Sequence, residues 1–134
     1  MKYEYNTYRT KSGELDIRFL FVEIKPNDWR AYILTDINYK EYSKARSDLI
    51  SVTHRLTEFD VAMKRRIKNF IEDNGIPYKK ENIRYICWTK TITTLESMRE
   101  LAKTWSEITD YYIRNGGSFE SIQPILKADG TITI

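Results

Sequence analysis

Apolar residues in the first third of the chain recur at every second position, which is the period of a half-buried β-strand. A segment rich in tyrosine and threonine, residues 3–10, comes first. After a Ser-Gly turn, the apolar residues on one face of the second segment are Leu15, Ile17, Phe19 and Phe21, and those on its other face are Leu20, Val22 and Ile24. Turn residues at Pro26-Asn27-Asp28 lead into a third alternating segment, residues 29–36. This pattern predicts an N-terminal meander of three strands.

The period is lost over residues 37–48, which we expect to form an irregular connection and a candidate binding loop. Alternation resumes over residues 49–56 and again over residues 83–89, and each segment predicts a further strand. The tail from Phe119 contains the turn residues Asp129-Gly130. We expect the tail to pair with the sheet.

Two segments change to the period of an amphipathic helix. The stripe of the first helix consists of Met63, Ile67, Phe70 and Ile71. Thr57 and Asp60 are its candidate N-terminal caps, and Asn74-Gly75 is its predicted end. The second helix is predicted to start at a capping box, Thr93-Thr94-Leu95-Glu96, and to carry Trp105 in its apolar stripe before Asn115-Gly116-Gly117 ends it.

These elements predict one α+β domain over residues 1–134. Its antiparallel β-sheet has about five to six strands, including the N-terminal meander, and packs against two amphipathic helices. The longest apolar run, Phe19 to Val22, is far shorter than the roughly 20 residues of a membrane span, and no apolar secretory region follows Met1. We therefore expect a cytoplasmic protein with no membrane partner.

The chain has one histidine, His54, and one cysteine, Cys87. Most metal sites need three or four closely spaced ligands, and most nucleophilic triads need a histidine base. His54 and Cys87 could form a thiol and its base, but Cys87 lies in an apolar segment that disfavours a reactive thiolate. We interpret both as structural residues and predict no catalytic residue, no metal site and no bound cofactor.

The sharpest enzymatic alternative is Glu23-Ile24-Lys25, which follows the apolar run of the second strand. It resembles the E-x-K strand of the PD-(D/E)xK nucleases, a family in which the strand carboxylate and an upstream aspartate hold a divalent metal while the lysine helps to activate water. Asp16 is upstream on the same strand, seven residues away and on the opposite face, so it cannot share a metal with Glu23. A partner from another strand, such as Asp36, stays open.

Basic residues concentrate between positions 64 and 84, although the net charge of the whole chain is only +3. This stretch is a candidate contact for nucleic acid or another anionic partner, and the alternative interpretation is a solvated helix face followed by a loop. The candidate contact residues are Lys64, Arg65, Lys68, Lys79, Lys80 and Arg84. Ten tyrosines could provide stacking surfaces, but strands favour tyrosine in any case.

Three segments resemble small uncharacterised proteins of mobile elements and prophages in Gram-positive gut bacteria. They are Thr53 to Leu56, Tyr85 to Trp88 and Trp105 to Gly116. The resemblance implies a role in element transfer, element maintenance or interference with the host, and it implies no known activity.

We therefore expect a small non-catalytic binding module that acts through a protein partner or through self-association. The first alternative is a nucleic-acid-binding accessory protein that uses the basic stretch. The second is a metal-dependent nuclease of the PD-(D/E)xK type.

Overall fold

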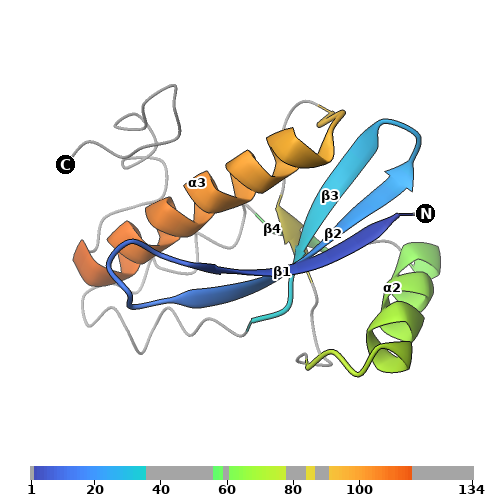
Figure 1. The fold of residues 1–134 in the computed structure, drawn as a ribbon, viewed down its shortest axis with the longest axis horizontal. Coiled ribbons are helices and arrows are strands. Elements are labelled where there is room, and N and C mark those ends of the chain that lie inside the picture. Colours follow the sequence, from blue (N-terminus) through green and yellow to red (C-terminus); the bar gives the residue numbers. More distant parts are fainter. Residues whose placement is uncertain (1, 36–55, 59–60, 78–83, 87–90, 116–134) are drawn as a thin grey trace.

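The computed structural model describes residues 2–35, 56–58, 61–77, 84–86 and 91–115 of the chain. These residues form an antiparallel β-sheet and two helices, as the sequence predicts (Figure 1). The strand order is β1-β2-β3-β5-β4. The strands are β1 (Tyr3–Arg9), β2 (Asp16–Lys25), β3 (Asp28–Ile33), β4 (Leu56–Glu58) and β5 (Arg84–Ile86), and the helices are α2 (Val61–Asp73) and α3 (Leu95–Asn115).

The first three strands are the predicted meander, with Tyr3 opposite Val22 and Leu20 opposite Tyr32. The turn between β2 and β3 is short because Asn27 adopts a left-handed backbone conformation, with φ of 59°. The register of this pair shifts between Glu23 and Lys25, so the end of β2 is irregular.

Strand β2 separates two hydrophobic clusters, one on each face of the sheet. The α3 face holds Phe19 and Phe21 together with Trp105 of α3. The α2 face holds Leu20 and Val22 of β2 and an apolar stripe of α2 that includes Ile67 and Ile71. Figure 1 shows the helices on opposite sides of the sheet, with α3 lying lengthwise along the meander and α2 near the start of β1. This placement explains why β2 is apolar on both faces.

The predicted end of α2 at Asn74-Gly75 is confirmed. The N–H of Gly75 bonds to the carbonyl of Glu72 at 3.2 Å, and the N–H of Ile76 bonds to that of Ile71 at 3.0 Å. This pair of bonds is a Schellman motif, and it requires the left-handed conformation that Gly75 adopts, with φ of 62°. Ile76 then packs against the α2-face cluster.

The predicted caps of both helices need correction. Thr57 is not the cap of α2, because it lies within β4 and pairs with Tyr85; Asp60 is outside the described residues. The cap of α3 is Thr94 rather than Thr93, since the Thr94 hydroxyl oxygen accepts the N–H of Ser97 at 3.1 Å. The N-terminal cap is therefore shifted by one residue, and the third helical position is Ser97 rather than Glu96.

Several predicted segments lie outside the described residues. They are the connection 37–48, the strand 49–56 except Leu56, both ends of the strand 83–89, and the tail from Phe119. The count of five to six strands depends partly on these segments and stays a prediction. Neither of the two helices that the structure describes is long and apolar enough to cross a membrane.

Candidate interaction surface

Strand β1 lies at the edge of the sheet that the described residues form, and one side of its backbone faces away from that sheet. The Thr10 N–H bonds to the Leu15 carbonyl, and the Glu23 N–H bonds to the Lys2 carbonyl, each at 2.9 Å. Bonded pairs alternate along an antiparallel ladder, so the even-numbered residues of β1 point their backbone groups at β2. The backbone groups of the odd-numbered residues point outward: Tyr3, Tyr5, Thr7 and Arg9.

One of these outward amides is covered locally. The N–H of Thr7 bonds to the side-chain oxygen Oδ1 of Asn6 at 2.9 Å. The described residues pair no other strand with the outer side of β1. An edge strand with unpaired backbone groups is a template for another strand, and β1 contains neither proline nor a bulge.

The even-numbered side chains of β1 lie against one stripe of α3. Glu4 contacts Arg99, and Tyr8 contacts Glu107 eight helix residues later. Four helix residues advance about 6 Å and two strand residues about 6.6 Å, so helix and strand stay in step. This spacing places Lys103 beside Asn6, midway between the two contacts.

A hollow of about 280 Å³ lies between β1 and α3 at this midpoint. Its apolar surface comes from Phe19 and Phe21 of β2 and from Ala102. The charged side chains that line it, Arg99 and Lys103, are both basic. The remaining lining residues are Asn6, Thr7 and Tyr8 of β1. We call this region the β1–α3 groove.

Each basic residue of the β1–α3 groove has a carboxylate partner. Arg99 donates two hydrogen bonds to Glu4, from Nε to Oε2 at 2.7 Å and from Nη2 to Oε1. These bonds hold the pKa of Glu4 below its usual value, against a smaller opposing effect of burial. Lys103 meets Glu100 at 3.3 Å, and both of these side chains are more than half exposed. An exposed pair of this kind is weak, so Lys103 can turn toward a ligand.

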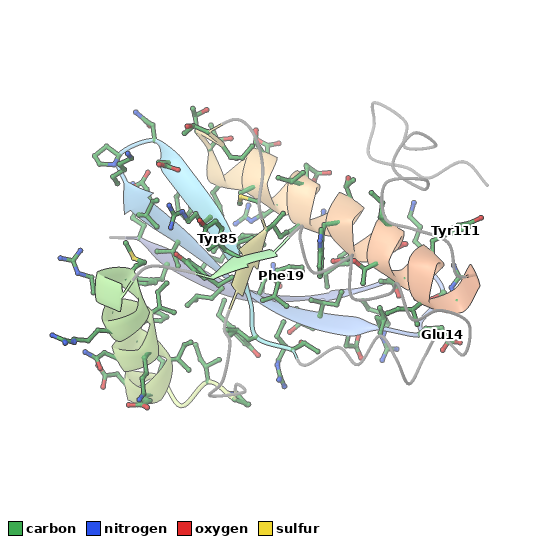
Figure 2. The ribbon with its side chains drawn as sticks, turned by 180° about the vertical axis from the view of Figure 1, so that it is seen from behind. Glu14, Phe19, Tyr85 and Tyr111 are labelled. Atoms are coloured by element: carbon green, nitrogen blue, oxygen red, sulfur yellow. The ribbon has the colours of Figure 1, made fainter. Side chains whose placement is uncertain are left out.

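The far end of the groove is fixed by the turn between β1 and β2. The Tyr8 hydroxyl and the Lys11 N–H both donate to Oε1 of Glu107, at 2.9 and 2.7 Å. Ser12 donates to Asp110 at 2.9 Å, and the other oxygen of this buried carboxylate accepts from Arg114 at 2.9 Å. Figure 2 shows Glu14 of the turn and Tyr111 of α3 at the same end of the molecule. The turn therefore holds β1 against α3.

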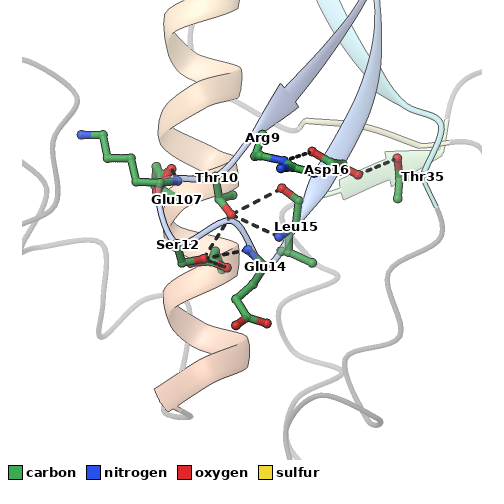
Figure 3. A network of polar contacts seen from close by, with 10 residues as sticks. Arg9, Thr10, Ser12, Glu14, Leu15, Asp16, Thr35 and Glu107 are labelled. Carbon is green, nitrogen blue, oxygen red and sulfur yellow. Dashed lines mark hydrogen bonds and ion pairs between the residues drawn. The ribbon is translucent and has the colours of Figure 1, made fainter.

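The turn also carries its own polar contacts (Figure 3). The Thr10 hydroxyl oxygen accepts the N–H of Leu15 at 3.2 Å, and the Ser12 hydroxyl oxygen accepts that of Glu14 at 3.1 Å. Gly13 takes the left-handed conformation, with φ of 77°. Next to the turn, Arg9 forms a two-bond ion pair with Asp16. These contacts give β1 a defined end.

The other face of β1 is aromatic. The Tyr3 ring stacks on Phe70 of α2 with centroids 4.0 Å apart. Burial raises the pKa of Tyr3, against a smaller opposing effect of the Arg66 charge. Tyr5 is 40% exposed and is the large hydrophobic side chain that stands out among the described residues. An added strand would meet Tyr5 on this face.

The structure brings together only part of the predicted basic contact. Arg65 and Lys68 are exposed on α2, and so is Arg66, which the candidate set left out. Lys64 lies in α2 and Arg84 lies in β5, where it pairs with Ile33 and Glu58. Lys79 and Lys80 are outside the described residues.

The nuclease residues lie at the two ends of β2. Lys25 is exposed and meets Asp28 at 3.8 Å, while Asp16 is engaged by Arg9, which lowers the pKa of Asp16. The described residues contain no cluster of three or more metal-ligating side chains. Asp36, His54 and Cys87 lie outside these residues, so those alternatives stay as predicted.

The sequence pattern identified β1 as a strand but not as the edge of the sheet, and it did not identify the β1–α3 groove. One signal was present: Arg99, Lys103 and Glu107 recur at intervals of four, which places them on one face of a helix. Only the contacts of Arg99 with Glu4 and of Glu107 with Tyr8 show that this face lies beside β1.

Comparisons with protein-family models, with curated proteins and with solved structures found no match to this chain.

Proposed function

We propose that this protein is a small non-catalytic interaction module that binds an extended segment of a protein partner along strand β1. In this binding mode the partner adds a strand to the sheet, and its backbone supplies hydrogen bonds to the outward groups of Tyr3, Tyr5 and Thr7. The observation that carries the proposal is the outer edge of β1, with which no other described strand pairs, beside the β1–α3 groove.

Two further features support this proposal. The edge strand is held at both ends, by the Tyr3–Phe70 stack and by the Tyr8–Glu107 hydrogen bond, so little ordering is needed on binding. The groove beside it offers a place for side chains, which is how strand addition gains specificity.

Proline at an outward position provides the test. Tyr5→Pro removes an N–H that does not bond to β2, and edge strands tolerate proline at such positions. Tyr5→Ala is the matched control, because it removes the same side chain and keeps the N–H. Tagged full-length proteins would be copurified from cells of the native host, with nuclease-treated and untreated halves compared. We expect the same partner with the wild type and Tyr5→Ala, no partner with Tyr5→Pro, and no effect of nuclease.

Thr7→Pro, compared with Thr7→Ala, repeats the experiment if Tyr5→Pro does not fold, since the Thr7 N–H is bonded to Asn6 and not to β2. Thermal melting followed by tryptophan fluorescence establishes that each variant is folded. A folded proline variant that retains the partner would disprove binding along β1.

A second candidate is nucleic-acid binding, and the exposed cations of α2 favour it. Arg65, Arg66 and Lys68 are close together in the sequence and all exposed. Two acids, Glu72 and Asp73, follow in the same helix and reduce its net charge. This balance makes nucleic acid the weaker proposal.

The cellular context remains a proposal too. The resemblance to mobile-element and prophage proteins suggests a cytoplasmic bacterial protein that interferes with a host protein or helps to maintain the element. An interaction module without catalysis suits such a role.

A further inference from the structure

We infer that the segment bound by β1 carries an acidic side chain at the position opposite Asn6, directed into the β1–α3 groove toward Lys103. This inference rests on the proposed function and names the chemistry of the partner. The recognised feature is an extended peptide with a carboxylate on one face and an apolar side chain next to it on the other.

The position of the acidic residue follows from the pattern of backbone hydrogen bonds along β1. Because the odd residues of β1 bond outward, a residue placed opposite Asn6 forms a non-bonded pair with it, and side chains of such pairs lie closest together. Its side chain then points to the α3 face, where Phe19 is the cross-strand neighbour of Asn6. The hollow between Asn6 and Lys103 is therefore the space that this side chain enters.

The charge of the partner's side chain follows from the residues that line the β1–α3 groove. Among the described residues that line the groove, Arg99 and Lys103 carry a charge and none has a carboxylate. Glu4 takes two of the five N–H donors of Arg99. The partner of Lys103 is an exposed residue three positions earlier in the helix. An acidic side chain can replace that weak pair.

Exchanging the present hydrogen bond of the Thr7 N–H for one to the partner changes the free energy little. The Thr7 N–H now bonds to Oδ1 of Asn6 and would bond to a partner carbonyl instead. One hydrogen bond replaces another, so the exchange costs little. The released Asn6 amide can then donate to the incoming carboxylate.

The opposite face defines the neighbouring side chains. The partner residues on either side of the acidic one point to the α2 face, next to Tyr5 and Thr7. Tyr5 is exposed there, and an apolar or β-branched neighbour would cover its ring. The predicted segment therefore alternates, with an acidic residue flanked by apolar ones.

A second copy of this chain is a poorer occupant. Antiparallel pairing of two β1 strands about Asn6 would place Asn6 against Asn6, with no acid facing Lys103. Pairing about Tyr5 would place Glu4 opposite Asn6, but Glu4 already holds Arg99 of its own chain. The Lys103 side chains of the two copies would also enter the same space between the helices, with like charges. The groove is thus better suited to a foreign acidic segment.

Selection from a displayed library of random nine-residue segments tests the inference. The bait is the full chain as wild type, Lys103→Glu, or Lys68→Glu, which makes the same charge change on α2, on the opposite face of the sheet. We expect the wild type and Lys68→Glu to enrich alternating segments with a central Asp or Glu, and Lys103→Glu to lose that preference. Synthetic peptides from the wild-type selection should bind about tenfold more weakly after Glu→Lys at the central position, and the Lys103→Glu protein should reverse this order.

The outcomes separate this inference from the proposed function. Enrichment of neutral or basic segments whose binding Tyr5→Pro abolishes would overturn the acidic preference and leave strand addition intact. Enrichment of no segment would overturn the inference, while the copurification decides on the proposed function by itself. A concentration-dependent dimer in sedimentation that Tyr5→Pro dissociates would overturn it in favour of a second copy.

Discussion

The hydroxyl of Tyr8 donates a hydrogen bond of 2.9 Å to Oε1 of Glu107, which ties the edge strand to the C-terminal half of α3. The same oxygen accepts the backbone N–H of Lys11 at 2.7 Å, so one carboxylate holds both the strand and the turn that follows it. Burial is the largest cause that raises the pKa of Tyr8, and the hydrogen bond to Glu107 is the next; together with nearby carboxylates they bring it to about 12. The folded protein therefore favours the neutral phenol.

Replacing Tyr8 with phenylalanine should lower the free energy of unfolding by about 1 kcal/mol at neutral pH, through loss of one hydrogen bond. The pKa is raised in the folded state, so the contribution is fully present below the unfolded pKa of 10.0 and is lost as the pH rises toward about 12. Urea unfolding at several pH values should show that the difference in free energy of unfolding between wild type and Tyr8→Phe becomes smaller above pH ~10. Tyr5→Phe, at an exposed hydroxyl on the same strand, is the control; a gap that widens in alkali would contradict the assignment.

The ion pair at the other end of the groove predicts the opposite pH dependence. Hydrogen bonding to Arg99 lowers the pKa of Glu4, so the pair stabilises the fold above the unfolded pKa of Glu4 and stops doing so as the pH falls through the lower folded value. Glu4→Gln should reduce stability at pH ~7 and make no difference in strong acid. Denaturant midpoints across this range provide the measurement. Glu14→Gln, at an exposed carboxylate in the turn, should have no effect at either pH.

The meander and both helices could be predicted because their sequence periods survive in the fold. Phe19 and Leu20 point to opposite faces of β2, and each is buried because a helix covers each face. The end of α2 was equally predictable, since Gly75 adopts the backbone conformation that few other residues tolerate.

The caps and the groove could not be predicted with the same accuracy. Thr93 and Thr94 are chemically identical, and only the point at which the backbone becomes helical decides which hydroxyl caps α3. The groove depends on how α3 packs along β1, which places residues 4 and 99 side by side. Local patterns carry no information on such distant contacts, so the sequence does not distinguish Arg99 and Lys103 from other charged residues on a helix face.

Truncation of Trp105 should threaten the fold. The side chain is 3% exposed, and its ring meets Phe19 edge to face with centroids 6.2 Å apart. Trp105→Ala should cost about 3–5 kcal/mol through cavity formation. Trp105→Phe should cost less, because the buried indole N–H has no hydrogen-bond partner among the described residues. Chemical denaturation of both, with exposed Glu100→Ala as control, checks this order; a Trp105→Ala protein with unchanged stability would contradict the core placement.

The corrected cap of α3 predicts a difference between two adjacent threonines. Thr94→Ala should destabilise the protein by about 1 kcal/mol, because the N–H of Ser97 loses its acceptor. Thr93→Ala, at an exposed position outside the helix, should change stability by less than about 0.5 kcal/mol. Thermal unfolding of the two variants side by side provides the comparison. Equal losses, or a larger loss at Thr93, would restore the original capping box.

Binding to nucleic acid can be separated from binding to protein by charge reversal on α2. Arg65 and Lys68 are both exposed, and the buried face of the helix is formed by Ile67 and Ile71, so Arg65→Glu with Lys68→Glu should leave the fold intact. Each neutralised phosphate contributes roughly −0.9 to the logarithmic salt dependence of binding to duplex DNA.

We expect weak binding of DNA and RNA or none, since the net charge is only +3 and acids share the helix with the cations. Fluorescence anisotropy at two salt concentrations should therefore show little difference between wild type and the double variant. Lys25→Glu with Lys103→Glu, the same charge change placed away from α2, is the control. Tight, salt-sensitive binding that is lost in the folded α2 variant and kept in the control would make nucleic acid the better proposal, because general electrostatic attraction would weaken equally in both.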